Sequence, residues 1–219
     1  MNSALQIYDY IIFDCDGVIF DTNKLKSDAF ALAVKDYPKE IVEEFVKYHQ
    51  QTGGISRYVK FRKFITDFLK ESFSETLYNQ LLNAYGQECI KIYQTASFTS
   101  GSQELFKLLK SNDKKLYVAS GSDENELKES FINRDISNYF EGILGSPKSK
   151  LDCVKEIKSQ NKEMNGLFIG DSYADYAAAN EAGLDFIFMK KFSEVSADQY
   201  KICTNNSIVV INDLTDLLN

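Results

Sequence analysis

The sequence lacks paired cysteines, a long hydrophobic run and a basic stretch at its N-terminus. Its four cysteines are widely spaced and form no C-x-x-C pair, and a chain of 219 residues can bury a core without disulfide bonds. No apolar stretch approaches the about 20 residues that a membrane-spanning helix needs. No basic residue precedes the short apolar run within residues 1–13, as one would in a secretory signal. These absences predict a cytoplasmic protein with reduced thiols and no membrane partner.

An excess of basic residues is also missing. The chain has 25 Lys and Arg against 32 Asp and Glu, which gives a net charge of -7. This balance argues against broad nucleic-acid binding, which requires clustered positive charge. A phosphate-bearing ligand would need local lysines, backbone amides or a metal ion to overcome the acidic background. The single histidine, His49, lies in a helical pattern, where we expect a surface role.

What the sequence does contain is a series of short apolar runs, each followed by a turn and a helical pattern. The runs lie at residues 11–13, 116–119, 167–169, 186–189 and 208–211. Near-continuous apolar runs of this length are typical of strands buried on both faces of a parallel sheet. Helical patterns occupy residues 103–110, 124–131, 151–159 and 173–182. Alternating strands and helices predict an α/β fold with a doubly wound, Rossmann-like parallel sheet.

One long segment interrupts this alternation. Residues 22–95 contain no convincing strand, only three amphipathic helical stripes rich in Phe and Tyr. The simplest organisation is an α/β core domain of residues 1–21 and 96–219, with a helical cap domain of residues 22–95 inserted after the first strand. Ligands of open α/β folds bind at the carboxyl ends of the strands, so we expect the cap to lie over the site.

Two pairs of acids follow two of the predicted strands. Asp14 and Asp16 come directly after the first strand, and side chains at i and i+2 of an extended chain point the same way. Asp171 follows the strand at 167–169, and Asp175 comes one helical turn later. Neighbouring carboxylates repel one another unless a cation or a shared proton intervenes. Oxygen ligands from two strand ends predict a magnesium site that water and a substrate phosphate complete.

Two further segments suit phosphate binding. Ser120 and Gly121 follow the strand at 116–119, and we expect their hydroxyl and backbone amides to form a phosphate cradle at the start of a helix. The loop at residues 145–150 carries Lys148 and Lys150. A lysine here would neutralise a phosphate and a nearby aspartate together. Each of these two segments is a weak signal by itself.

In their order and strand-end placement, the four segments resemble the four motifs of the haloacid dehalogenase superfamily, which is dominated by phosphatases. The resemblance covers nearly the whole chain, including a helical insert where that family carries its first type of cap. The chain looks closest to the branch of phosphoglycolate phosphatase-like and beta-phosphoglucomutase-like proteins. The segments that carry this closer likeness are 17–22 (GVIFDT) and 53–57 (GGISR).

The resemblance implies a role for each catalytic residue. Asp14 would attack phosphorus and become an aspartyl phosphate, and Asp16 would protonate the leaving oxygen and then activate water. Ser120 would bind the transferring phosphoryl group, while a lysine stabilises its charge. Lys150 is favoured for that lysine, because it precedes an x-acid-apolar sequence as in the family, and Lys148 fits a longer loop spacing.

The resemblance also implies the magnesium ligands and the activity. Mg²⁺ would be held by the Asp14 carboxylate, the Asp16 backbone carbonyl and Asp171, with Asp175 supporting them. The implied activity is a magnesium-dependent phosphatase that acts on a small phosphorylated metabolite, a sugar phosphate or a phospho-acid. We expect a monomer or a weak homodimer.

Two other functions remain open. A phosphomutase would use the same core residues, and the GISR segment of the cap favours it. Related mutases, however, usually place a histidine near the position of Lys26. A non-catalytic binding module is disfavoured, because both acids of the first motif are present. For substrate contact from the cap we predict Arg57 and, more weakly, Lys60, with an exposed surface role as the alternative for Arg57.

Overall fold

The computed structural model describes residues 3–218, so the outermost ends of the predicted core domain, residues 1–2 and 219, lie outside the described residues. Its centre is a sheet of six parallel strands in the order β3-β2-β1-β4-β5-β6. The strands are β1 (Tyr10–Phe13), β2 (Lys115–Asp123), β3 (Gly142–Ser146), β4 (Gly166–Gly170), β5 (Asp185–Met189) and β6 (Val209–Ile211). This sheet confirms the prediction of a doubly wound α/β fold.

The strand β3 was not predicted from the sequence. Glycines at 142 and 145 leave only Ile143 and Leu144 as its apolar run, which is too short to be recognised by itself. The strand forms because it pairs with β2, with Val118 opposite Ile143. Tertiary pairing therefore decides an element that local hydrophobicity leaves undetermined.

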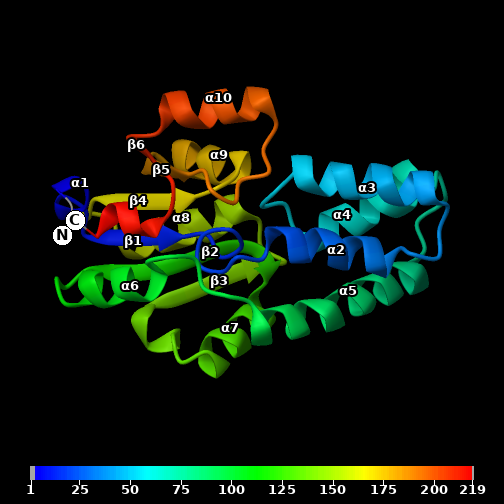
Figure 1. Ribbon diagram of the computed structural model, residues 1–219, viewed down its shortest axis with the longest axis horizontal. Helices are drawn as coiled ribbons and strands as arrows, with labels where there is room; N and C mark the ends of the chain where they lie inside the picture. Colours follow the sequence, from blue (N-terminus) through cyan, green and yellow to red (C-terminus); the bar gives the residue numbers. More distant parts are fainter. Residues whose placement is uncertain (1–2, 219) are drawn as a thin grey trace.

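Helices cover both faces of the sheet (Figure 1). Side chains of α6 (Ser102–Lys110) and α7 (Glu124–Asn133) pack on one face with Ile11 and Phe13 of β1. Side chains of α8 (Lys150–Gln160), α9 (Tyr173–Ala182) and α10 (Ala197–Asn206) pack on the other face with Tyr10 and Ile12. Alternate residues of β1 thus enter opposite layers, as the period of a strand requires. The short helices are α1 (Ser3–Gln6), Ser137–Tyr139 and Leu214–Leu217.

The helices α6, α7, α8 and α9 confirm the four predicted helical patterns, whereas α10 was not predicted. No helix within residues 3–218 is both long and apolar enough to cross a membrane.

The chain between β1 and β2 forms a separate group of helices. They are α2 (Asn23–Ala33), α3 (Lys39–Gln51), α4 (Arg57–Lys63), a π-helical turn (Phe64–Phe68) and α5 (Glu75–Thr95). They enclose an apolar cluster of their own, centred on Phe30, Phe45, Phe61 and Phe64. This independent cluster supports the proposed division, and we continue to call residues 22–95 the cap.

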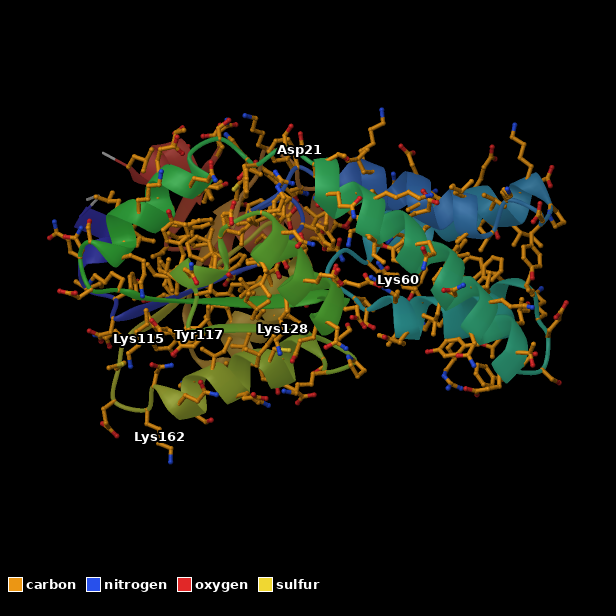
Figure 2. The ribbon with its side chains drawn as sticks, turned by 90° about the horizontal axis from the view of Figure 1, so that it is seen from below. Asp21, Lys60, Lys115, Tyr117, Lys128 and Lys162 are labelled. Atoms are coloured by element: carbon orange, nitrogen blue, oxygen red, sulfur yellow. The ribbon has the colours of Figure 1, made fainter. Side chains whose placement is uncertain are left out.

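The cap adjoins one end of the sheet (Figure 1). Figure 2 shows Lys60 on the cap side of the junction, while Lys115 and Lys162 lie toward the far end of the core. Since Lys115 begins β2, the end that meets the cap is the carboxyl end of the strands. The fold therefore brings the cap helices to the edge where ligands of α/β sheets bind.

Candidate active site

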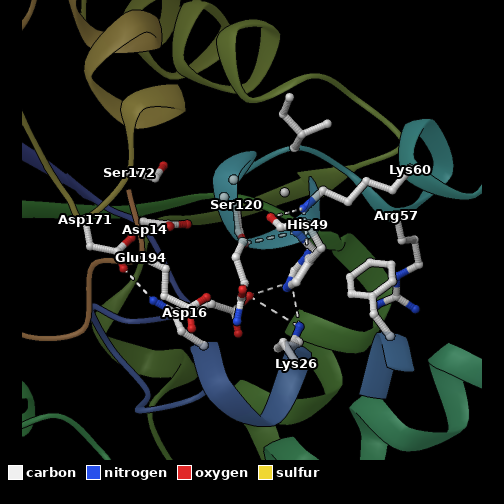
Figure 3. A pocket seen from close by; sticks show the side chains of 18 of the residues that line it. Asp14, Asp16, Lys26, His49, Arg57, Lys60, Ser120, Asp171, Ser172 and Glu194 are labelled. Atoms are coloured by element: carbon white, nitrogen blue, oxygen red, sulfur yellow. Dashed lines mark hydrogen bonds and ion pairs between the residues drawn. The ribbon is translucent and has the colours of Figure 1, made fainter. Parts of the chain in front are cut away.

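A cavity of about 70 Å³ lies between the cap and the carboxyl ends of the central strands. Asp14, Ser120 and Asp171 line it from the core, and His49 and Lys60 line it from the cap (Figure 3). This volume is well below the roughly 300–1,000 Å³ of pockets that hold drug-sized ligands. With the cap in this position, the cavity suits a small ligand.

Three buried carboxylates meet at this edge of the sheet. Asp14 follows β1, Asp171 follows β4, and Asp175 stands in the first turn of α9. One oxygen from each of the three lies within 4.8 Å of the others. Hard cations such as Mg²⁺ prefer oxygen ligands, so the donor set fits that ion.

Without a bound cation, the negative charges of these buried carboxylates are unfavourable. Burial raises the pKa of Asp14 to about 7; the Asp175 carboxylate adds to this, and Lys150 opposes it. Burial also raises the pKa of Asp171 well above its usual range, and the neighbouring Asp14 and Asp175 act in the same direction. The raised pKa values reflect repulsion between the carboxylates, and a divalent cation bound among them would offset it.

Lys150 is the lysine that reaches the carboxylates. Its Nζ lies 2.9 Å from Asp14 Oδ1 and also contacts Asp175 Oδ1. Burial would lower the pKa of Lys150, but the two carboxylates outweigh it and raise the pKa. Lys148 is exposed, does not line the cavity, and pairs with Glu156 at 2.7 Å. The structure therefore does not bring Lys148 to this cavity.

Asp175 also begins the helix that follows it. Its Oδ2 accepts hydrogen bonds from the Ser172 amide at 2.9 Å, the Ser172 hydroxyl at 2.7 Å and the Asp171 amide at 3.2 Å. Asp175 therefore completes a capping box with Ser172 at the start of α9 and also forms an ion pair with Lys150. By holding Lys150 and the turn after Asp171, Asp175 occupies a supporting position.

Asp16 is held by a different set of groups from Asp14. It accepts hydrogen bonds from Thr22 Oγ1 at 2.6 Å and from Ser122 Oγ at 2.7 Å. Tyr93 OH lies 3.1 Å from both carboxylate oxygens, and Lys26 Nζ lies 3.3 Å from Oδ2. Burial alone would raise the pKa of Asp16, but Lys26 and the hydroxyl donors outweigh it, so the pKa is lowered.

The expected position of Ser120 and Gly121 at a helix start is wrong. The strand β2 continues to Asp123, and α7 begins only at Glu124, with the Asp123 side chain as its cap. Pairing of Asp123 with Ser146 of β3 extends the strand past the point where its apolar run ends. Ser120 still lines the cavity, and its Oγ accepts a hydrogen bond from the Ser122 amide at 3.1 Å.

Gly121 allows the cap to approach the core closely. A Cβ on Gly121 would lie 2.3 Å from the backbone oxygen of Gly54 in the cap. Gly54 has φ 79°, in the left-handed region that glycine tolerates best. The loop at residues 53–54 therefore bends toward the core.

Arg57 begins α4 and is buried, so the exposed alternative for this residue is wrong. Its guanidinium lines the cavity and forms two hydrogen bonds to Glu126 of α7, at 2.8 and 2.5 Å. A cation in the first turn of a helix is disfavoured by the helix dipole unless an anion lies near it. In the structure that anion is a core carboxylate.

His49 does not have the surface role expected for it. Its Nδ1 lies 2.8 Å from Lys60 Nζ, and its ring packs on Phe30 with 4.2 Å between the ring centroids. Burial lowers the pKa of His49 well below its usual range, and the charge of Lys60 acts in the same direction. The helical pattern around His49 gave no sign of which face meets the core, because that depends on how the cap packs.

Sequence reasoning also missed Asn23 and Glu194. Asn23 Nδ2 donates to Asp171 Oδ2 at 2.6 Å and to the Phe192 carbonyl at 2.7 Å. Glu194, which keeps an exposed surface, lines the cavity from the loop after β5, and partial desolvation raises its pKa. Glu194 lies five residues beyond the predicted strand at 186–189 and after two lysines, so the strand-end argument that selected Asp171 does not reach it.

Comparison with known proteins supplies a family and a set of similar folds. Residues 11–189 match the family described as haloacid dehalogenase-like hydrolase. No protein of curated function matches the chain significantly.

Three solved structures illustrate the similarity of fold. A predicted phosphoglycolate phosphatase from Haemophilus somnus is 17% identical, with a TM-score of 0.76 and 98% of each chain covered. The beta-phosphoglucomutase of Clostridium difficile is 22% identical, with a TM-score of 0.71, 96% of this chain and 93% of that chain covered. The hydrolase YfnB of Bacillus subtilis bound to magnesium is 17% identical, with a TM-score of 0.69 and 97% of each chain covered. At these identities the likeness concerns the fold.

Proposed function

The chain belongs to the haloacid dehalogenase-like hydrolases, and from this premise we propose that it is a magnesium-dependent phosphatase of a small phosphorylated metabolite. The reaction would be hydrolysis of a phosphoric monoester through an aspartyl phosphate on Asp14. Family membership also favours an enzyme over the non-catalytic binding module.

The observation that carries this proposal is the convergence of Asp14, Asp171, Asp175 and Lys150. The three buried carboxylates lie close enough together to hold one metal ion, and the ammonium of Lys150 lies 2.9 Å from Asp14 Oδ1. A carboxylate nucleophile beside a fixed cation suits phosphoryl transfer, in which negative charge on the equatorial oxygens must be stabilised. Asp14 and Asp171 would hold Mg²⁺ with the backbone carbonyl of Asp16, and the bound ion would offset charge on the phosphoryl oxygens.

The chain's own residues account for each bond and proton. An Asp14 oxygen attacks phosphorus, the bond to the leaving oxygen breaks with its electron pair, and Asp16 gives that oxygen a proton. Asp16 then takes a proton from water, whose oxygen attacks phosphorus and releases phosphate from Asp14. Lys26 and the hydroxyls around Asp16 lower its pKa and favour the carboxylate. This form activates water in the second step, whereas the first step requires Asp16 to carry a proton when the substrate is bound.

A phosphomutase of the beta-phosphoglucomutase type is the second candidate. It would share the core residues and is compatible with the GISR segment of the cap. Lys26 occupies the place of the expected histidine, where its Nζ hydrogen-bonds Tyr93 OH and Ser122 Oγ, both at 2.8 Å. An ammonium held in this way, beside Asp16, supports the phosphatase over a mutase that carries a histidine at this place.

The decisive experiment measures phosphate release from a panel of phosphorylated sugars, phospho-acids and nucleotides, with Mg²⁺ and then with excess chelator. We expect turnover of a small ester that chelator abolishes and added Mg²⁺ restores. Full turnover in chelator, with the metal content checked, would remove the metal from the mechanism.

The mutase is tested with beta-glucose 1-phosphate and a trace of glucose 1,6-bisphosphate. Efficient formation of glucose 6-phosphate with little free phosphate would overturn the phosphatase proposal.

A further inference from the structure

Lys60 differs from the other buried cations around the active site because it has no acidic partner. Lys26 pairs with Asp16, Arg57 with Glu126, and Lys150 with Asp14 and Asp175. Lys60 is 1% exposed, and within residues 3–218 no carboxylate forms an ion pair with it.

This burial is unfavourable for the folded protein. Removing an ammonium from water without an opposite charge is costly. Burial lowers the pKa of Lys60 to about 7, and the charges of Lys26 and Lys150 act in the same direction. The more distant Asp16 and Glu194 only partly offset this. An apolar side chain at position 60 would avoid the cost, so packing alone does not account for a lysine here.

The hydrogen bonds of Lys60 leave one donor free for a ligand. An ammonium has three N–H groups. His49 Nδ1 accepts one at 2.8 Å, and the His49 backbone oxygen accepts a second at 3.3 Å. The half-buried His49 ring, neutral because its pKa is lowered, can serve as this acceptor. No third acceptor lies within hydrogen-bond distance among the described residues.

The amine is also aimed at the catalytic cavity. Both Lys60 and His49 line it, together with Asp14 and Ser120. Figure 3 shows Lys60 extending from the cap toward His49, while Asp14 and Asp171 lie across the view on the core side. A small ligand held at Asp14 would therefore have its far end directed to the cap.

Building on the phosphatase function proposed above, we propose that Lys60, held by His49, binds a second anionic group on the substrate. The transferring phosphoryl group lies at Asp14 and Ser120, and a carboxylate or a second phosphate on the leaving group meets Lys60. Such an oxyanion supplies both the missing acceptor and the missing negative charge. The cavity volume of about 70 Å³ keeps the carbon chain between the two groups short.

The test compares matched esters that differ only at the far end. Alkyl phosphates of two to four carbons are paired with analogues that end in a carboxylate, and with analogues that end in a second phosphate. For one anionic series we expect kcat/KM about 10- to 100-fold above that of its alkyl partner, the factor expected from one charged hydrogen bond. Comparison of the two anionic series identifies the preferred group.

Variants assign this preference to Lys60. Lys60→Met should lose the preference, because KM should rise more for the anionic esters than for the alkyl phosphates. Lys60→Arg should keep part of it. Lys63→Met, which alters an exposed lysine of the same helix, is the control and should behave as the wild type. Thermal unfolding of each variant checks that it is folded.

Two results would contradict the proposed Lys60 subsite and leave the proposed phosphatase function standing. One is equal kcat/KM for alkyl and anionic esters in the wild type. The other is an equal loss on both kinds of ester in Lys60→Met. If no phosphoric ester is hydrolysed with Mg²⁺ present, the phosphatase function itself fails, and the subsite fails with it.

Discussion

The guanidinium of Arg57 in the cap donates two hydrogen bonds, of 2.8 Å and 2.5 Å, to the carboxylate of Glu126 in the core. The two side chains are 5% and 18% exposed, so the pair is largely shielded from water. Tyr58, the next residue, adds a hydrogen bond of 2.7 Å from its hydroxyl to Asp123. The first turn of α4 thus fixes the cap over the cavity whatever Arg57 does with substrate.

Arg57→Ala and Glu126→Ala should each lower stability, because each leaves a shielded charge without its partner. The loss should be up to about 3–5 kcal/mol, the usual cost of breaking a buried pair. In denaturant titrations the double variant should lose much less than the sum of the two singles. Glu129→Ala, an exposed acid on the same helix, is the control.

The same variants show whether Arg57 also binds the substrate. Arg57→Ala should raise KM for the true substrate more than for a small artificial phosphate ester. If the two KM values rise equally, or if Glu126→Ala reproduces the whole effect, then Arg57 acts only by holding the cap.

Asp14→Asn should abolish turnover, because an amide is a poor nucleophile and a weaker metal ligand. Asp16→Asn should permit slow phosphorylation of Asp14 but suppress leaving-group protonation and hydrolysis, lowering the rate about 10²–10⁴-fold. Rapid-quench experiments with labelled substrate would detect the trapped phosphoenzyme in Asp16→Asn. Near-wild-type turnover in Asp14→Asn would mean that another residue is the nucleophile.

Gly121→Ala should lower kcat/KM by about tenfold or more, a loss of roughly 1.4 kcal/mol of transition-state stabilisation. Its Cβ would meet the Gly54 oxygen at 2.3 Å and force the cap away from Asp14. Gly54→Ala should also be impaired, since its φ of 79° strains any other residue. Gly53→Ala, whose Cβ would have its nearest contact at 3.5 Å, should stay close to wild type. Equal behaviour of all three variants would argue against a tight cap–core contact.

Lys60→Met should stabilise the protein at neutral pH, in contrast to most core substitutions. The pKa of Lys60 is about 7 in the folded chain and 10.5 when unperturbed. Between these values the unfolded chain binds a proton that the native chain does not, so Lys60 costs stability increasingly as pH falls from 10.5 toward 7.

The variant should therefore exceed wild type by about 2–4 kcal/mol near pH 7, and by less near pH 9.5. Urea unfolding at the two pH values measures the gap. A constant gap would mean that the pKa of Lys60 is not lowered.

The sequence alone determined the sheet and its acidic edge. Apolar runs predicted β1 and β4. Because parallel strands have their carboxyl ends at one edge of the sheet, Asp14 and Asp171 had to lie close together. Start and stop signals likewise marked α9, with Asp175 in its first turn and Gly183 at its end. The strands and α9 depend on residues near one another in the chain, which is why local patterns predict them, and the meeting of the two acids follows from the common edge of a parallel sheet.

Tertiary structure decided the remaining positions. Lys148 and Lys150 share one loop, and only the packing of α8 turns Lys150 toward Asp14. β2 runs past Ser120 because β3 pairs with it. The burial of Arg57 and the place of His49 in the cavity wall depend on how the cap meets the core. Contacts between segments far apart in the chain leave no periodic signal in either segment, so only the folded chain reveals which face each side chain presents.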